Sequence, residues 1–369
     1  MKTSIVLGML YGDEGKGQTA SFLSNNRTLI VRFNGGCQAG HTVVKNGYRH
    51  VFSSFGSGTM NGAHTYWSEY CTFYPKSFYN EQRRLREEGF KPVHFIHPMA
   101  PVTTPFDIDH NRQTEDINKH GSVGMGFGAT IARNENTPYK LYTVDLQYRE
   151  VLVHKLKQIA SYYKVENPEE DINNFLKYVD AIKLNIITLS EIKDYYGHIV
   201  FEGAQGIMLD MDFGFFPNVT RSNTTSKNAM KIIVENKLPV PEIYYCMRSY
   251  LTRHGNGYMP NEDENMQYED QTNYTKKYQG KFRQGWHSIE QINHVLRLDN
   301  IFTAPCTKHL SICCLDQTNE RILIDGQHET IEKFISRIER QIENIIVSSS
   351  TDSEKMLLIP STFRIPVKA

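Results

Sequence analysis

Short apolar runs alternate with segments of helical periodicity along the chain. Residues 5–10 (Ile-Val-Leu-Gly-Met-Leu) and residues 29–33 (Leu-Ile-Val-Arg-Phe) are almost entirely apolar, as expected of strands buried on both faces. Residues 76–89 and 168–182 instead repeat apolar side chains at helical spacing among charged ones. This alternation predicts an α/β fold with a mostly parallel central sheet and flanking helices.

A small antiparallel part is expected beside this sheet. Residues 42–52 alternate polar and apolar side chains around Asn46-Gly47, a dipeptide that favours the type I′ turn of a β-hairpin. Residues 92–97 read as a further strand. A chain of 369 residues is long enough for one large domain or two smaller ones, and we expect a single domain over residues 1–369.

The turn after the first strand is rich in glycine and charge. It reads Gly12-Asp13-Glu14-Gly15-Lys16-Gly17 and precedes a predicted helix start at residues 19–23. Glycines there let backbone N–H groups converge on an anion at a helix N-terminus, and Lys16 adds a positive charge. The pattern predicts a phosphate site. A turn of solvated charges is the alternative for such a motif taken alone.

This turn is not the usual P-loop, because Gly17 stands where a P-loop carries the Ser or Thr that binds magnesium. Asp13 can replace that residue. As a carboxylate among N–H donors beside Lys16 it is able both to bind Mg²⁺ and to take a proton from a substrate N–H. His41, on a second glycine-rich turn, is a candidate donor to a transferring phosphoryl group or a developing oxyanion.

Composition limits the class of ligand. The 41 basic and 41 acidic residues cancel, which argues against a general nucleic-acid or membrane-surface protein and favours a small-molecule ligand. The six cysteines form no C-x-x-C pair, so we expect reduced thiols. No signal region and no apolar stretch of about 20 residues is present, which predicts a cytoplasmic protein.

Several motifs together resemble the adenylosuccinate synthetase family. The first turn lies in VLG-x3-GDEGKG and the second in VRFNGG-x-x-AGHT, where family members carry GDEGKGK and GG-x-NAGHT. Residues 201–225, FEGAQG-x-MLD-x-D-x-G-x-x-P-x-VT-x-SNTT, make the longest continuous match. Residues 121–128, 250–262 and 280–286 resemble further family segments. The resemblance covers residues 3–310 and says least about residues 311–369.

The resemblance implies a ligase that joins L-aspartate to C6 of a purine nucleoside monophosphate, with hydrolysis of a nucleoside triphosphate and a 6-phosphoryl intermediate. The implied catalytic residues are Asp13, Lys16 and His41. The resemblance also implies nucleotide contacts at Gly12, Asp13, Glu14, Gly15, Lys16, Gly17, Gln18, Gly40, His41, Thr42 and Lys308. It implies purine monophosphate contacts at Gln38, Ala39, Ser122, Val123, Gln205 and Thr220. Aspartate contacts are implied at Gly280, Lys281 and Arg283, in a mobile loop at residues 261–284, and Mg²⁺ ligands at Asp13 and Gly40. Family members form homodimers in which an arginine of one subunit reaches the site of the other. Arg133 is the nearby candidate for this arginine, although its position does not match the register of the family motif.

The departures from the family pattern indicate a particular branch. Aligned on residues 307–310, Leu310 replaces the Asp that reads guanine in family members using GTP, which predicts ATP or dATP as donor. Gln38 replaces an Asn, Val123 and Lys281 also differ, and the chain is short. The chain thus resembles the phage branch, the 2-aminoadenylosuccinate synthetases, whose substrate is dGMP.

Other interpretations remain open. Asp13, which some phage members lack, keeps an adenylosuccinate synthetase acting on IMP in consideration. A nucleotide-binding protein without turnover is opposed by the presence of both Asp13 and His41. A P-loop ATPase or GTPase is disfavoured by Gly17.

Overall fold

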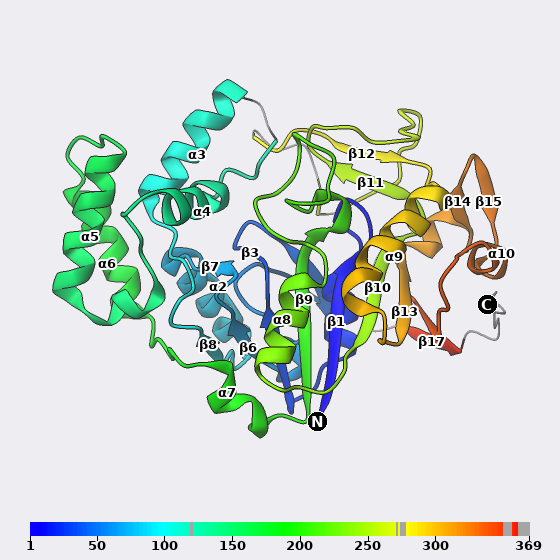
Figure 1. Ribbon diagram of the computed structural model, residues 1–369, viewed down its shortest axis with the longest axis horizontal. Helices are drawn as coiled ribbons and strands as arrows, with labels where there is room; N and C mark the ends of the chain where they lie inside the picture. Colours follow the sequence, from blue (N-terminus) through cyan, green and yellow to red (C-terminus); the bar gives the residue numbers. More distant parts are fainter. Residues whose placement is uncertain (119–120, 271, 274–277, 350–355, 361–369) are drawn as a thin grey trace.

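A nine-stranded sheet runs through the middle of the molecule (Figure 1). The computed structural model describes residues 1–118, 121–270, 272–273, 278–349 and 356–360. The strand order is β17-β16-β13-β10-β1-β9-β2-β6-β8, and every pairing except β16 with β17 is parallel. The strands are β1 Lys2–Gly8, β2 Thr28–Arg32, β6 His64–Trp67, β8 His94–Ile96, β9 His198–Gly206, β10 Glu242–Arg248, β13 Lys308–Cys313, β16 Asn344–Val347 and β17 Leu357–Pro360. The predicted α/β class is confirmed.

Helices cover both faces of the sheet. β1 lies between β9 and β10, and its Ile5, Val6 and Leu7 are completely buried, as a continuous apolar run predicts for a central parallel strand. Ile5 and Leu7 share a core with α8 and α9, whereas Val6 shares one with Ala20 of α1. The helices are α1 Lys16–Phe22, α2 Pro75–Glu87, α3 Pro105–Asn118, α4 Phe127–Asn136, α5 Arg149–Tyr162, α6 Glu169–Ala181, α7 Leu189–Ile192, α8 Lys227–Glu235, α9 Ile289–Thr303 and α10 Ile331–Ser336.

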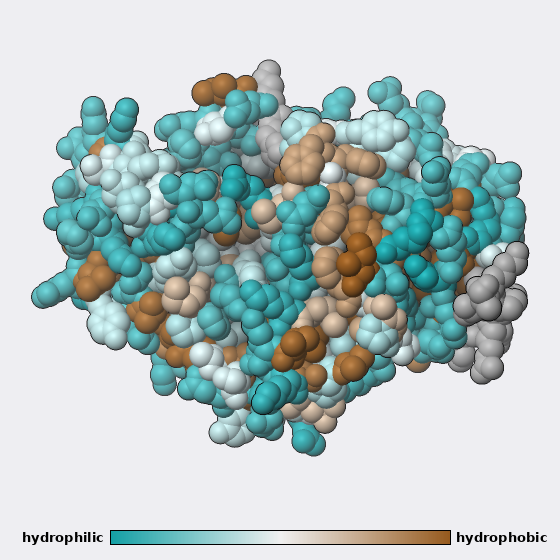
Figure 2. All heavy atoms as spheres, viewed as in Figure 1, coloured by the Kyte–Doolittle hydropathy of each residue, from teal (hydrophilic) through white to brown (hydrophobic). Residues whose placement is uncertain are grey.

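A second core lies to one side of the sheet, where α3, α4, α5 and α6 gather at the left of Figure 1. Phe78 of α2, Phe106 of α3 and Leu152 of α5 belong to this core. Polar residues predominate on the outer face of these helices in Figure 2, as expected of helices that bury one stripe. No helix in the described part of the chain is long and apolar enough to cross a membrane.

The predicted hairpin is confirmed. Strands β4 His41–Lys45 and β5 Tyr48–Phe52 pair antiparallel, and Asn46 and Gly47 between them have φ values of 49° and 76°, as a type I′ turn requires. The described residues form three more two-stranded ribbons beside the sheet. They are β3 Gly35–Gly36 with β7 Cys71–Thr72, β11 Leu251–His254 with β12 Phe282–Gly285, and β14 Ile322–Ile324 with β15 Gln327–Glu329.

Some elements differ from the prediction. α1 begins at Lys16, three residues before the expected start, so the lysine lies in the first turn of the helix. α3 was not expected, because its charged and amide-rich sequence shows a weak apolar stripe. Part of the predicted mobile loop, residues 271 and 274–277, lies outside the described residues, as do residues 361–369.

Candidate active site

A cavity lies at the carboxyl edge of the sheet, where β1, β9, β10 and β13 end side by side. Loops at this edge are the usual ligand site of a parallel α/β sheet. Of the residues predicted from the sequence, those lining the cavity are Asp13, Glu14, Gly15, Lys16, Gly17, Gln18, Gln38, Ala39, Gly40, His41, Thr42 and Gln205. The structure therefore brings the first two glycine-rich turns together with the end of β9.

Glu14 and Lys16 lie under the first glycine-rich turn. The Glu14 carboxylate is buried and accepts hydrogen bonds from the backbone N–H groups of Leu10 and Gly12, the latter at 3.1 Å. Burial raises the pKa of Glu14 to about 7, although Lys16 opposes the shift. A Cβ on Gly8 would lie 2.5 Å from the backbone carbonyl oxygen of Gln205, so β1 must end in glycine for β9 to approach it this closely. The side chain of Glu14 thus holds the turn itself.

Asp13 adopts a left-handed backbone conformation, with φ of 57°. Asp is one of the few residues that tolerate this conformation. The guanidinium of Arg248, at the end of β10, donates to the Asp13 carbonyl and fixes the turn from the neighbouring strand. Asp13 and Gly40 both line the cavity, and a carboxylate together with a backbone carbonyl are oxygen donors that would suit Mg²⁺.

His41 is held by a carboxylate that the sequence did not identify. Its Nδ1 lies 2.6 Å from Glu202 Oε1, in the middle of β9. Glu202 also accepts hydrogen bonds from the Ser57 backbone N–H at 3.0 Å and from the Ser57 hydroxyl. Gly17 makes room for the histidine, because a Cβ there would lie 2.7 Å from His41 Cβ. This explains why glycine occupies the Ser/Thr position of a P-loop.

Electrostatics favour a neutral histidine against an ionised carboxylate. Burial lowers the pKa of His41, and Glu202 only partly offsets the shift. Burial alone would raise the pKa of Glu202, but His41, Arg32 and Ser57 together bring it below its ordinary value. Neutral His41 then donates Nδ1–H to Glu202, which leaves Nε2 for a ligand in the cavity.

Two glutamines, Gln38 and Gln205, line the cavity. Neither amide atom of Gln38 has a hydrogen-bond partner among the described residues, although both are buried. The amide rests on the second glycine-rich turn, since a Cβ on Gly36 would lie 2.9 Å from Gln38 Oε1. Gln205 has a left-handed φ of 66°, a strained conformation of the kind found at ligand sites. Both side chains are poised for a ligand with donors and acceptors.

The remaining predicted contacts do not line the cavity in this structure. Ser122 bonds to Asn111 at 3.3 Å, Val123 follows it, and the Thr220 backbone N–H bonds to the Leu209 carbonyl at 2.9 Å. In the predicted aspartate loop, Lys281 is exposed and Gly280 has a φ of 83°. That Gly12, Ser122, Val123, Thr220, Gly280 and Lys281 contact a ligand remains a prediction.

Arg283 is occupied by its own loop. Its guanidinium forms an ion pair with Glu262 at 2.6 Å and donates to the carbonyls of Gly255 and Gly257 at 3.0 and 2.8 Å. An aspartate substrate would have to displace some of these partners to be bound by Arg283.

The alignment of Lys308 and Leu310 with the base-reading segment is wrong. Lys308 begins β13, and its Nζ donates to the carbonyls of Thr303 and Cys306 at 3.0 and 3.2 Å. Leu310 is completely buried in the core in the middle of that strand, so it cannot face a base. The part of this segment that reaches the cavity is the end of the strand, at residues 313–317.

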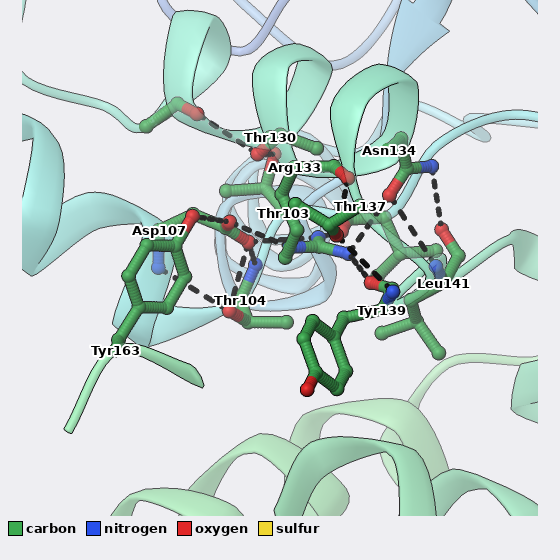
Figure 3. A network of polar contacts seen from close by, with 12 residues as sticks. Thr103, Thr104, Asp107, Thr130, Arg133, Asn134, Thr137, Tyr139, Leu141 and Tyr163 are labelled. Atoms are coloured by element: carbon green, nitrogen blue, oxygen red, sulfur yellow. Dashed lines mark hydrogen bonds and ion pairs between the residues drawn. The ribbon is translucent and has the colours of Figure 1, made fainter. Parts of the chain in front are cut away.

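Arg133 is a structural residue and not an arginine offered to a partner. It is buried beneath α4, and its Nε and Nη2 donate to Asp107 at 2.8 and 3.0 Å (Figure 3). Further donations reach the carbonyls of Val102 and Tyr139. Arg133 therefore holds α3 and α4 together.

The chain is similar to known proteins. The family model for adenylosuccinate synthetase matches residues 5–325. The adenylosuccinate synthetase of Borrelia duttonii is 29% identical over 366 residues, covering 92% of this chain and 83% of that protein. The enzyme of Colwellia psychrerythraea is 33% identical over 282 residues, covering 71% of this chain and 65% of that protein.

Two solved structures have the same fold. Adenylosuccinate synthetase from Plasmodium falciparum superposes with a TM-score of 0.75 at 18% identity, covering 96% of this chain and 99% of that one. The cyanophage S-2L succinoaminodeoxyadenylate synthetase, solved with dGMP and with dATP as energy donor, superposes with a TM-score of 0.68 at 16% identity, covering 98% and 96%. The chain belongs to the adenylosuccinate synthetase family of purine-biosynthetic ligases.

Proposed function

We propose that this ligase joins L-aspartate to C6 of dGMP, with ATP or dATP as phosphate donor, and forms N6-succino-2-amino-2′-deoxyadenylate. The observation that carries the choice of purine is the buried, unpartnered amide of Gln38. A guanine base presents a 2-amino group that hypoxanthine lacks, and Oε1 of Gln38 is an acceptor for it. A site with a buried acceptor discriminates against the base without the donor, since the acceptor is then left unpaired.

The first step activates the purine oxygen. Asp13 takes the N1 proton, and the O6 that thereby gains negative charge attacks the γ-phosphorus of the donor. The P–O bond to the nucleoside diphosphate breaks as the O6–P bond forms. Lys16, in the first turn of α1, and the N–H groups of the glycine-rich turn stabilise the phosphoryl oxygens. Mg²⁺, held by Asp13 and the Gly40 carbonyl, would supply further positive charge at these oxygens.

The second step replaces the phosphoryl oxygen with nitrogen. The aspartate amine attacks C6 and loses a proton as the C6–N bond forms. The C6–O6 bond breaks, and inorganic phosphate leaves with O6. His41 stabilises the negative charge in both steps. An anionic phosphoryl group next to Nε2 raises the pKa of the imidazole, and Glu202 stabilises the imidazolium on the opposite side. His41 then donates to the oxygen that carries the charge.

The choice of ATP or dATP rests on the end of β13, because the argument from Leu310 no longer holds. Cys313, Cys314 and Gln317 line the cavity there, and all three are uncharged in their ordinary states. Guanine requires an acceptor for its N1–H and 2-amino hydrogens. Asp316 is exposed and does not line the cavity, although it is the carboxylate closest in sequence.

An IMP-specific adenylosuccinate synthetase is the second candidate, because Asp13 and His41 serve hypoxanthine as well as guanine, and both bases share N1–H and C6=O. A nucleotide-binding protein without turnover is the third. The homodimer and the cytoplasmic location expected from the sequence stay predictions.

Phosphate release separates enzyme from binding protein. We expect release from ATP only when L-aspartate and dGMP are both present, with a succinylated product of matching mass. Gln38→Asn provides the specificity test, because it keeps the amide but shortens the side chain. The variant should lose kcat/KM for dGMP relative to IMP by about 10-fold or more, as one lost buried hydrogen bond predicts. An unchanged ratio would remove Gln38 from base recognition.

A further inference from the structure

Two adjacent cysteines lie at the end of β13. Cys313 is the last residue of the strand and Cys314 the next, and both line the cavity. Their Sγ atoms are 3.8 Å apart. All six cysteines of the chain are free thiols. These two therefore form a dithiol inside the candidate active site, and none of the chemistry proposed above uses it.

Backbone geometry places this dithiol against the phosphate-binding turn. Cys314 has a left-handed φ of 64°, which is unusual for a residue with a Cβ. On the other side, a Cβ on Gly15 would lie 2.9 Å from Cys313 Sγ. Cys313 Sγ therefore packs closely against Gly15, and a movement of this sulfur would change the packing of the phosphate-binding turn.

The two thiols differ in acidity. The hydrogen bond with Cys313 lowers the pKa of Cys314, and the nearby Arg248 guanidinium adds to this effect against the opposing effect of burial. The pKa of Cys313 is raised, first by the same hydrogen bond and then by burial. Two thiols 3.8 Å apart, one of them near a guanidinium, can act as an attacking and a resolving thiol.

We propose that Cys313 and Cys314 are a peroxide-reactive dithiol that forms a reversible disulfide at the donor end of the cavity. The Cys314 thiolate attacks a peroxide oxygen, so that an S–O bond forms, the O–O bond breaks and hydroxide leaves to become water. The Cys313 sulfur then attacks the sulfenic sulfur, the S–S bond forms, and hydroxide leaves with the Cys313 proton as water. In total, two thiols are oxidised by two electrons and one peroxide is reduced to two waters.

The disulfide is expected to be easily reduced. Adjacent Cα atoms across a trans peptide are about 3.8 Å apart, below the usual range of about 4.4–6.8 Å for disulfides. Strained disulfides have more oxidising potentials and belong to the labile, regulatory kind. Joining the sulfurs draws Cys313 Sγ away from its present place against Gly15, which alters the turn that binds phosphate.

The test is oxidation of the full-length protein with hydrogen peroxide, followed by alkylation and peptide mass spectrometry. We expect the peptide containing Cys313 and Cys314 to lose two hydrogens and resist alkylation, and dithiothreitol to restore it. Cys313→Ser and Cys314→Ser should each abolish the loss, whereas Cys37→Ser, which removes a cysteine outside the pair, should leave it intact. Stable oxygen adducts on Cys314 of the wild type, or oxidation confined to other cysteines, would overturn the proposal.

Nucleotide protection is measured in the same experiment and rests on the proposed function. ATP at about ten times its Kd leaves about a tenth of the sites open, so disulfide formation should slow about 10-fold. Disulfide formation that ATP does not slow would support the dithiol and contradict only the donor site. Loss of aspartate-dependent phosphate release on oxidation, with recovery on reduction, is the expected functional consequence.

Discussion

Glu202 Oε1 lies 2.6 Å from His41 Nδ1, and the two side chains are buried together at the back of the cavity. The pair joins the second glycine-rich turn to the middle of a central strand, across 161 positions of sequence. A carboxylate behind a histidine fixes its tautomer and supports its protonated form. The geometry thereby makes the charge state of His41 depend on what occupies the cavity.

Replacing Glu202 with Gln should shift the pH dependence of the reaction. Loss of the negative charge removes the interaction that raises the pKa of His41, so the imidazolium is lost at lower pH. If His41 acts as a donor, the alkaline limb of kcat moves to lower pH, and on that limb the rate falls about 10-fold for every pH unit by which it moves. The measurement is kcat against pH for wild type and Glu202→Gln. Superimposable alkaline limbs would show that His41 does not act as the donor.

Asp13→Ala should abolish most of the turnover. Proton removal from N1 by a positioned carboxylate is worth about 10²–10⁴-fold. Asp212, an exposed carboxylate paired with Lys227 at 2.9 Å, supplies the control, and Asp212→Ala should keep aspartate-dependent phosphate release near the wild-type rate. More than a tenth of wild-type turnover in Asp13→Ala would exclude it as the base.

Substitution of Asp316 tests the choice of phosphate donor. With dGMP and aspartate saturating, we expect ATP or dATP to exceed GTP in kcat/KM, and Asp316→Asn to leave that ratio unchanged. A preference for GTP that collapses by about 10-fold or more in Asp316→Asn would assign guanine recognition to this carboxylate.

The sequence predicted the parts of the site that lie in continuous motifs. Glycine-rich turns after apolar runs have a local physical meaning, so Asp13, Lys16 and His41, which line the cavity, could be proposed as site residues without the fold. Glu202 was missed because its role depends on contacts with residues far away in the sequence. A carboxylate directly after the apolar run 199–201 and before a glycine was nevertheless a visible signal. Buried carboxylates are rare unless they have partners.

Register was the main source of error. Residues 307–310 match the letters of a family motif, yet residues 308–310 form the start of β13. A short motif does not show how far a strand continues beyond it. A few residues at about 3.3 Å each separate Leu310 from the cavity edge. The sequence shows a positive charge at Arg133 but not its partner. Only the fold shows that Arg133 forms an ion pair with Asp107.

Asp107→Ala should strongly destabilise the fold. The change leaves the Arg133 guanidinium buried without its carboxylate, and breaking one partner of a buried pair costs about 3–5 kcal/mol in the free energy of unfolding. Asp180→Ala removes an exposed partner of Arg149 and should cost about 0–1 kcal/mol. Urea denaturation of both variants gives the comparison. Equal losses would mean that the Arg133 network in Figure 3 adds nothing beyond a surface pair.

The most direct test of the proposed function is a competition among dGMP, GMP, IMP and dIMP. All four are present at equal concentration with L-aspartate and ATP, and the products are identified by mass. The account predicts that dGMP is consumed first and that N6-succino-2-amino-2′-deoxyadenylate is the main product. Preferential consumption of IMP, with adenylosuccinate as the product, would contradict it.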